Sequence, residues 1–298
     1  MIRRALVIAN PGSRRGAARA EAVRDTLDGR GIECALALTE RPGHAAELAA
    51  AARSGHDAVF AVGGDGTAME VAGALSGSRC AVGVIPAGTG NLLARALGIP
   101  YDVREAVESL VTGTRLALDL GRLDSGRSFA IAAGVGIDAA MIADTPTWLK
   151  QRLGVLAYVI TGSRAALRAV LTEGAFTARV TVDGETTECA ASTVMVANFG
   201  ALLGGRITLG SGIRADDGVM DVCVFAPRSV RDVLDIAWRL ATRDFSPTPA
   251  LTYRRGRTIR VETDPAMPSQ ADGELLGWGP LVITVQPRCV ALLVPRPG

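Results

Sequence analysis

Residues 57–75 read DAVFAVGGDGTAMEVAGAL, and this stretch decides the fold. Residues 57–62 predict a buried strand and residues 68–75 a helix, so three glycines lie in a strand-to-helix turn. Such a turn lets an anion approach the backbone, and the start of the helix offers unpaired N–H groups and a partial positive charge. Asp65 would repel a phosphate there unless a divalent cation lies between them or the carboxylate bonds a hydroxyl. The pattern favours nucleotide and magnesium chemistry, with an ordinary glycine turn capped by Asp or Thr as the alternative.

The first 115 or so residues alternate between strand and helix patterns around this turn. Strands are predicted at 6–9, 32–38, 57–62 and 81–85, and helices at 17–27, from about 44 to 53, 68–75, 92–97 and 103–111. This alternation predicts a parallel sheet covered on both faces. Ligands of such sheets bind beyond the carboxyl ends of the strands, where the loops 10–16, 39–43, 63–67 and 86–91 would converge.

The pattern changes near residue 114 and becomes rich in strands. Strands are predicted at 116–123, 129–133, 175–182, 188–197, 219–226, 251–262 and 281–294, and helices at about 149–172 and 230–242. Many short strands with Asp-Gly turns favour an antiparallel sandwich. We therefore expect an α/β nucleotide domain over 1–115 and an all-β domain over 116–298, whose last strand could return to the first domain.

Composition excludes several classes of protein. The net charge of +2 is too small for a nucleic-acid-binding protein, and no apolar run reaches the 18 residues of a membrane span. Lys150 is the only lysine, which excludes a P-loop and a protein-kinase site built on a strand lysine. The five cysteines are scattered and are expected to be reduced, as in a cytoplasmic protein. If the chain handles ATP, it uses another kind of cradle.

Four stretches of the second half could carry chemistry. Residues 134–139 have the spacing of a dinucleotide fingerprint, but no β-α-β unit surrounds them, and a turn packed against another backbone explains them better. Residues 216–218 (Asp-Asp-Gly) could be a plain turn or could hold a cation. Residues 269–277 are turn-like, and Glu274 within them could be a positioned base. The helix that begins at 149 could pack on the core or contact a membrane surface.

Together these motifs resemble, in family order and over nearly the whole chain, the diacylglycerol kinase-type bacterial lipid kinases, which share their catalytic domain with sphingosine kinases. The matching stretches lie at residues 10–13, 39–45, 63–67, 86–91 with 94–95, 119–121, 134–139, 150–158, 216–218 and 272–274. The resemblance implies a phosphofructokinase-like α/β domain, a β-sandwich domain and a cleft between them.

The resemblance also implies site residues and cofactors. ATP would be bound by Asn10, Pro11, Gly12, Ser13, Arg14, Thr39, Gly63, Gly64, Asp65, Gly66, Thr67, Ala68, Met69 and Thr89. Asp65 would work with the catalytic Mg²⁺, Asp119 would join the same acidic cluster, and Glu274 would accept the proton. A structural cation would be held by Asp217 with backbone oxygens around Arg214 and Val219.

The implied activity is transfer of the γ-phosphate of ATP to a lipid hydroxyl, which belongs to phospholipid biosynthesis. The acceptor is left open among diacylglycerol, a sphingoid base and other lipid alcohols, because the sequence departs from the family pattern at 204–206 and 209–212. The expected partner is a lipid at a membrane surface, which implies a cytoplasmic protein attached peripherally to the inner membrane surface; a homodimer is one option. The alternatives are a soluble-substrate kinase resembling NAD kinases and a regulatory module that binds nucleotide without turnover.

Overall fold

The computed structural model describes residues 2–12, 16–136, 175–202, 207–210 and 212–296. The chain divides into two compact units, one made of Met1–Leu120 with Gln286–Gly298 and the other of Gly121–Val285. Strands β5 (Thr114–Leu123) and β18 (Leu281–Val294) contribute residues to both units. The expectations placed at Ser13, Arg14 and the 149–172 helix lie outside the described residues.

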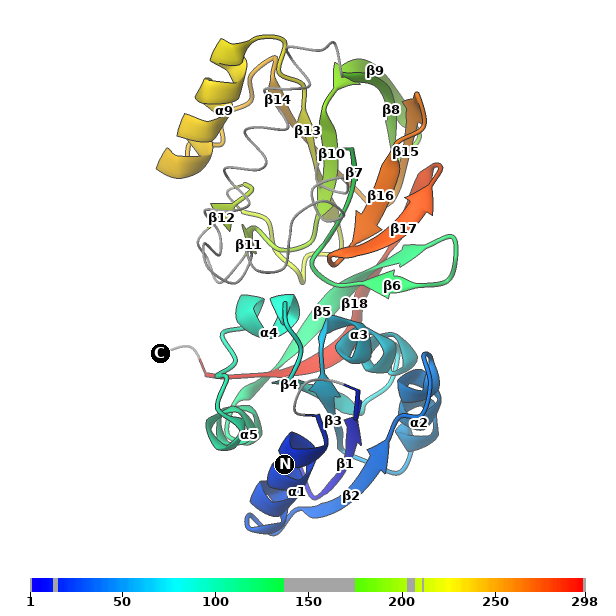
Figure 1. Ribbon diagram of the computed structural model, residues 1–298, viewed down its shortest axis with the longest axis vertical. Helices are drawn as coiled ribbons and strands as arrows, with labels where there is room; N and C mark the ends of the chain where they lie inside the picture. The colour runs from blue at the N-terminus through cyan, green and yellow to red at the C-terminus, as the bar shows by residue number, and fades with distance from the viewer. Residues whose placement is uncertain (1, 13–15, 137–174, 203–206, 211, 297–298) are drawn as a thin grey trace. The chain divides into compact units, whose positions relative to one another are not determined.

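The first unit is an α/β unit (Figure 1). Its further elements are β1 (Arg4–Ala9), α1 (Gly16–Asp28), β2 (Glu33–Leu38), α2 (His44–Ala52), β3 (Ala58–Gly63), α3 (Asp65–Ala74), β4 (Ala81–Pro86), α4 (Leu92–Ala96) and α5 (Val103–Val111). The strands lie in the order β2-β1-β3-β4-β18, and the pairs among β1 to β4 are parallel. Helices α1 and α5 contact each other, as do α2 and α3, and Figure 1 shows the two pairs on opposite sides of the strands.

Helices on both faces explain why β3 and β4 are buried along their whole lengths, as in other parallel sheets. The last strand, β18, pairs in parallel with β4 through Leu292 and Val82. The same strand pairs antiparallel with β15 (Thr258–Asp264) through residues 281–284. One long strand therefore completes the sheet of the first unit and also belongs to the second.

The second unit is built from antiparallel strands and one described helix. Its further elements are β6 (Ser128–Phe129), β7 (Ala132–Gly136), β8 (Phe176–Val182), β9 (Glu185–Ala191), β10 (Thr193–Ala197), β11 (Ala201–Leu202), β12 (Ile207–Thr208), β13 (Met220–Phe225), α9 (Val230–Thr242), β14 (Leu251–Gly256), β16 (Pro268–Ala271) and β17 (Glu274–Trp278). One sheet has the order β14-β13-β10-β7-β16-β17, and β18-β15-β8-β9 form the other. A shared core joins Val135, Val194 and Val222 of the first sheet to Val180 and Ile283 of the second, which confirms the predicted sandwich.

The stretch around 269–277, interpreted as turn-like, is a β-hairpin of strands β16 and β17. A bulge shifts the register between Ser269 and Gln270, so that Leu275 and Trp278 oppose Gln270 and Pro268. Because one extra residue reverses the alternation of side chains, a leucine and a tryptophan three residues apart lie on one face of the strand. They are 49% and 73% exposed.

Two expectations about the second half can be compared with the described residues. Residues 134–136 end strand β7, and a Cβ at Gly136 would lie 2.5 Å from the carbonyl oxygen of Ser192, so the close approach to another backbone is confirmed up to residue 136. No helix among the described residues is both long and apolar enough to cross a bilayer.

Candidate active site

The loops that carry the predicted nucleotide-binding residues leave the same edge of the first unit's sheet. Strands β1 to β4 are parallel, so their carboxyl ends meet there. Backbone bonds tie the residues that follow the strands: Asn10 N–H donates to Val62 at 3.1 Å and Thr39 N–H to Ala9 at 2.9 Å. Ala87 N–H donates to Gly63 at 2.8 Å. The sheet thus brings together four loops that are far apart in the sequence, as expected for a ligand site of an α/β unit.

Two glycine turns are in direct contact at this edge. A Cβ built on Gly88 would lie 2.5 Å from the Cα of Gly64, and one built on Gly63 would lie 2.6 Å from the Cβ of Thr67. Asn91 holds the second turn, because its side chain accepts from Gly88 N–H at 2.9 Å and donates to Gly88 O at 2.8 Å. The glycines are therefore required by close packing of two backbones, in addition to any ligand.

Asp65 is the first residue of α3 and is partly exposed. Its Oδ1 accepts from Leu93 N–H at 3.0 Å, which connects it to the turn before α4. Its Oδ2 accepts no hydrogen bond and meets no cationic side chain within the described residues. A carboxylate fixed by one oxygen, with the other available beside free helix N–H groups, fits a hydrated Mg²⁺ that also contacts phosphate.

The other predicted nucleotide-binding residues divide by exposure. Thr89 is exposed and Thr39 partly exposed, while Asn10 forms a turn by accepting from Gly12 N–H at 2.9 Å. In contrast, Ala68 and Met69 are 2% and 8% exposed, so their side chains belong to the core and only their backbone could approach a ligand.

Sequence patterns missed Arg19, a buried cation on α1. Its guanidinium donates to the carbonyl oxygens of Pro86 and Tyr101, the latter at 3.1 Å, and lies 4.3 Å from the centre of the Tyr101 ring. Pro86 is the last residue of β4, directly before the second glycine turn. Arg19 therefore stabilises the segment that leads into that turn. Arginine is common on the exposed faces of helices, so the sequence does not indicate that Arg19 is buried.

Asp119 is completely buried on β5, and its Oδ1 accepts from Arg288 N–H at 2.6 Å. Its carboxylate is thus held by the backbone of β18. The described residues contain no group of three His, Cys, Asp or Glu side chains placed to hold a metal ion. The role of Asp119 in an acidic cluster stays a prediction.

Glu274 begins β17 in the second unit and forms an ion pair with Arg127. The Glu274 side chain is 50% exposed, so its carboxylate can be reached from solvent. The preceding Asp272 fixes this position: its carboxylate accepts from the N–H groups of Ala130 and Ile131 at 2.8 Å and of Ala132 at 3.1 Å. Sequence reasoning missed this role of Asp272, because an Asp-Gly pair indicates only the hairpin turn and the three donors lie 140–142 residues away.

The predicted structural cation site holds an arginine among its acids. Asp217 accepts from Val219 N–H at 3.3 Å and pairs with Arg255, whose Nε also lies 3.2 Å from Asp221. Burial raises the pKa of Asp221 against the opposing effect of Arg255, and its Oδ2 is buried without a partner in the described structure. That oxygen fits a cation, while Arg255 already neutralises part of the charge of the two aspartates. Arg214, also predicted for this site, pairs instead with Asp216.

Comparisons with known proteins agree with this architecture. Residues 4–123 match the diacylglycerol kinase catalytic domain, and residues 130–294 match the YegS C-terminal NAD kinase beta sandwich-like domain. A diacylglycerol kinase of Bacillus subtilis is 28% identical over 301 residues, covering 99% of this chain and 97% of that protein. An uncharacterised protein of Synechocystis is 31% identical over 246 residues, and this chain spans 55% of its length.

A solved structure shows the same fold. A diacylglycerol kinase of Bacillus anthracis superposes with a TM-score of 0.73 at 20% identity, over 98% of this chain and 97% of the other. The two domain matches together extend from residue 4 to residue 294 with a short gap. The family expected from the sequence is therefore confirmed: the chain belongs to the diacylglycerol kinase catalytic-domain family of kinases.

Proposed function

We propose that this protein is a lipid kinase that uses ATP and Mg²⁺ and transfers the γ-phosphate to a lipid hydroxyl of the diacylglycerol type. The observation that carries the proposal is Asp65, which begins α3 beside two touching glycine turns at the carboxyl edge of the sheet. The names of the relatives support the acceptor class, because the Bacillus subtilis and Mycobacterium tuberculosis proteins are called diacylglycerol kinases.

Each residue has a definite task in this proposal. The turns at 63–67 and 88–91 and the start of α3 bind phosphate oxygens through backbone N–H groups. Asp65 holds Mg²⁺, which when bound screens the charge of the phosphates. Glu274 accepts the proton of the attacking hydroxyl, and Arg127 keeps its carboxylate in place. The proposal requires Asp65 and Glu274, which belong to different units, to serve one reaction.

Replacement Glu274→Gln tests the proton acceptor. We expect kcat to fall by about 10²-fold, because an amide cannot accept the proton, while unfolding stays within about 0.5 kcal/mol since an exposed ion pair contributes little. Glu188→Gln is the matched control, because Glu188 is equally exposed in the same unit and pairs with Arg179 at 3.0 Å. Initial rates with Mg-ATP and diacylglycerol micelles are measured for both variants. Full activity of Glu274→Gln would refute the role of Glu274 as the proton acceptor.

Replacement Asp272→Asn tests the positioning of Glu274. The asparagine oxygen can keep the bonds from Ile131 and Ala132 N–H, but its amide nitrogen then faces Ala130 N–H, so we expect the free energy of unfolding to fall by about 2 kcal/mol and kcat to fall with it. Asp183→Asn is the control: Asp183 also precedes a glycine in a hairpin turn, and it accepts from Arg257 and Thr258 N–H at 2.9 and 2.8 Å. Both bonds reach Oδ1 of Asp183, which an asparagine retains, so that variant should lose less stability and should keep its rate at a temperature where both variants are folded. Equal rates in the two variants would contradict the positioning role.

A further inference from the structure

Helix α9 is fixed firmly to the second unit by its inner face and its ends. Ile236 packs with Ala250 and Leu251 in a small core cluster. A capping box of Ser229 and Asp232 closes the start of the helix. These contacts fix the orientation of α9, and therefore which of its faces is turned outward.

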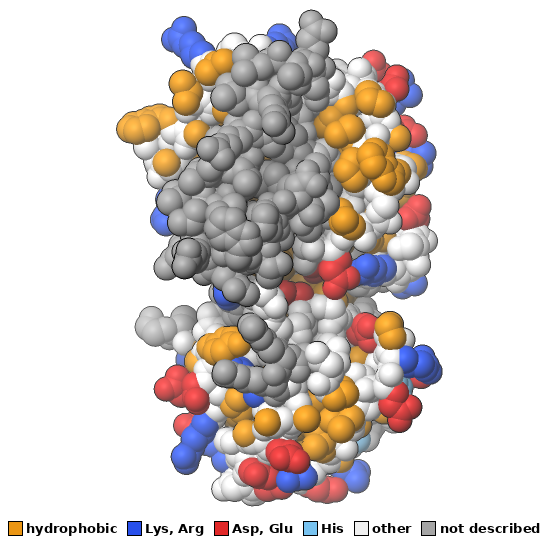
Figure 2. All heavy atoms as spheres, in the orientation of Figure 1, with side chains coloured by type: hydrophobic (Ala, Val, Ile, Leu, Met, Phe, Trp, Pro, Cys, Tyr) orange, Lys and Arg blue, Asp and Glu red, His pale blue; other side chains and the backbone are white. Residues whose placement is uncertain are grey.

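The outer face of α9 is apolar as well. Val230, Leu234 and Trp238 follow one another at intervals of four residues, so they share one side of the helix. They are 42%, 65% and 69% exposed, which is unusual for side chains of this size. Figure 2 shows hydrophobic side chains at this edge of the second unit. We call Val230, Leu234 and Trp238 the α9 stripe.

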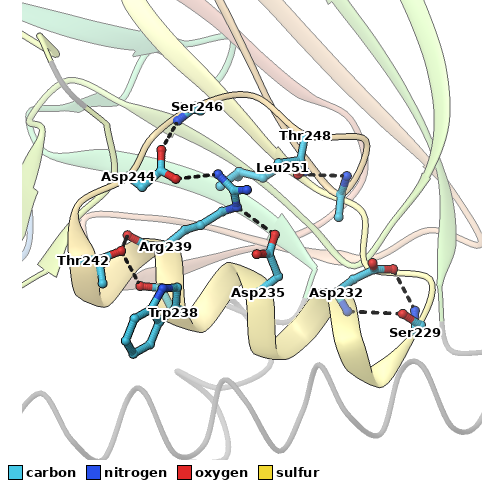
Figure 3. Close-up of polar contacts among 11 residues, drawn as sticks. Ser229, Asp232, Asp235, Trp238, Arg239, Thr242, Asp244, Ser246, Thr248 and Leu251 are labelled. Atoms are coloured by element: carbon cyan, nitrogen blue, oxygen red, sulfur yellow. Dashed lines mark hydrogen bonds and ion pairs between the residues drawn. The ribbon is translucent and has the colours of Figure 1, made fainter.

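The acids of α9 are held in hydrogen bonds and ion pairs. Asp232 accepts from the N–H groups of Arg228 and Ser229 at 2.8 and 3.0 Å. Arg239 binds both Asp235 and Asp244, at 2.7 and 2.8 Å. Figure 3 shows the contacts of Arg239 with Asp235 and Asp244 on one side of the helix and the Trp238 ring on the other.

Two cations remain available. Arg231 and Arg243 are exposed, and neither forms an ion pair with any residue that the structure describes. Residues 228–244 carry four arginines and three aspartates, so the net charge around α9 is +1. An outer face that combines leucine, tryptophan and arginine is typical of helices that lie in the headgroup region of a bilayer.

We infer that the α9 stripe, with Arg231 beside it and Arg243 at the end of the helix, is the surface by which this protein docks on an anionic lipid bilayer. A second copy of the chain is a poorer occupant, because three side chains bury only a few hundred Å² where a stable interface buries about 800 Å² per partner. A bilayer needs no such area. Leu234 and Trp238 can insert shallowly while two arginines are attracted to anionic headgroups, and together these give reversible binding. The inference deepens the proposed function, because a kinase with a lipid acceptor must meet a bilayer.

Vesicle flotation tests the inference without any catalysis. The full chain is mixed with vesicles of phosphatidylcholine alone or with added phosphatidylglycerol. We expect binding to the anionic vesicles, and a loss of at least about tenfold in the double variant Leu234→Ser, Trp238→Ser. The control is Leu275→Ser, Trp278→Ser, an exposed leucine and tryptophan among the described residues of the same unit. Thermal unfolding verifies that both variants are folded.

Charge variants separate attraction to the headgroups from apolar insertion. The variant Arg231→Gln, Arg243→Gln should weaken binding by roughly fivefold per arginine, and added salt should weaken the wild type in the same way. Arg79→Gln removes an exposed arginine of the first unit that forms no ion pair in the described structure, and it should bind as the wild type does.

Three outcomes would overturn the inference. The first is no binding of the wild type to either vesicle, and the second is unchanged binding of the Leu234, Trp238 variant. The third is light scattering that shows a dimer which this variant converts to monomer, because a second copy would then cover the α9 stripe. Failure of the proposed function is separate: it would appear as vesicle binding without phosphate transfer.

Discussion

Replacement Asp65→Asn is expected to lower phosphate transfer by at least about 10³-fold and to leave the fold intact. The asparagine side chain keeps an oxygen that can accept from Leu93 N–H, so the link between α3 and the second turn survives. It loses the negative charge, and its amide nitrogen cannot coordinate a cation. Charge stabilisation of several kcal/mol by a metal corresponds to a factor of this size.

The control for Asp65→Asn is Asp102→Asn in the same unit. Asp102 caps α5 by accepting from Glu105 N–H at 3.0 Å, and asparagine caps helices about as well as aspartate. This control should keep both stability and rate. The measurement is kcat at saturating ATP over a Mg²⁺ titration, together with the midpoint of thermal unfolding. A wild-type rate for Asp65→Asn would remove Asp65 from the catalytic site.

Replacement Gly88→Ala should damage both the fold of the site and its ligand binding. The added Cβ would lie 2.5 Å from the Cα of Gly64, and because backbone lies on both sides of this contact, one of the two turns must move. Overpacking of this kind costs about 1–3 kcal/mol. Displacing the turn at 63–67 also moves the N–H groups that would bind phosphate, so ATP affinity should fall by at least about tenfold.

The matched control is Gly55→Ala, at an exposed position where a Cβ meets no atom within 4 Å. It should stay within about 0.5 kcal/mol of the wild type. Chemical denaturation and ATP titration by calorimetry compare the two variants. If Gly88→Ala is as stable as the control and binds ATP equally well, the two turns do not depend on their close contact.

The sequence predicts the first unit well because each of its signals is local. Apolar runs of four to six residues end in glycine or Asx turns, and helices with small residues follow, so strand, turn and helix are each specified within about ten residues. The strand and the glycine turn lie where the pattern places them, but α3 begins at Asp65, three residues before the predicted start at 68.

What the sequence does not reveal depends on contacts between distant residues. The β16–β17 hairpin was missed because a bulge breaks the alternation that marks a strand. The burial of Arg19 depends on carbonyl oxygens of Pro86 and Tyr101, which lie 67 and 82 residues away. The helix at 230–242 is predicted from its pattern, but its exposed outer stripe emerges only once its inner face is packed.

The most direct measurement is transfer of label from γ-labelled ATP to lipid. The purified protein is incubated with Mg²⁺, labelled ATP and a total lipid extract in mixed micelles, and the organic and aqueous phases are then separated. We predict label in the organic phase, dependent on Mg²⁺ and abolished by Asp65→Asn, and the labelled species would identify the acceptor. Saturable ATP binding without label in the organic phase would contradict the account, and would direct the search to soluble acceptors such as NAD or to a regulatory module.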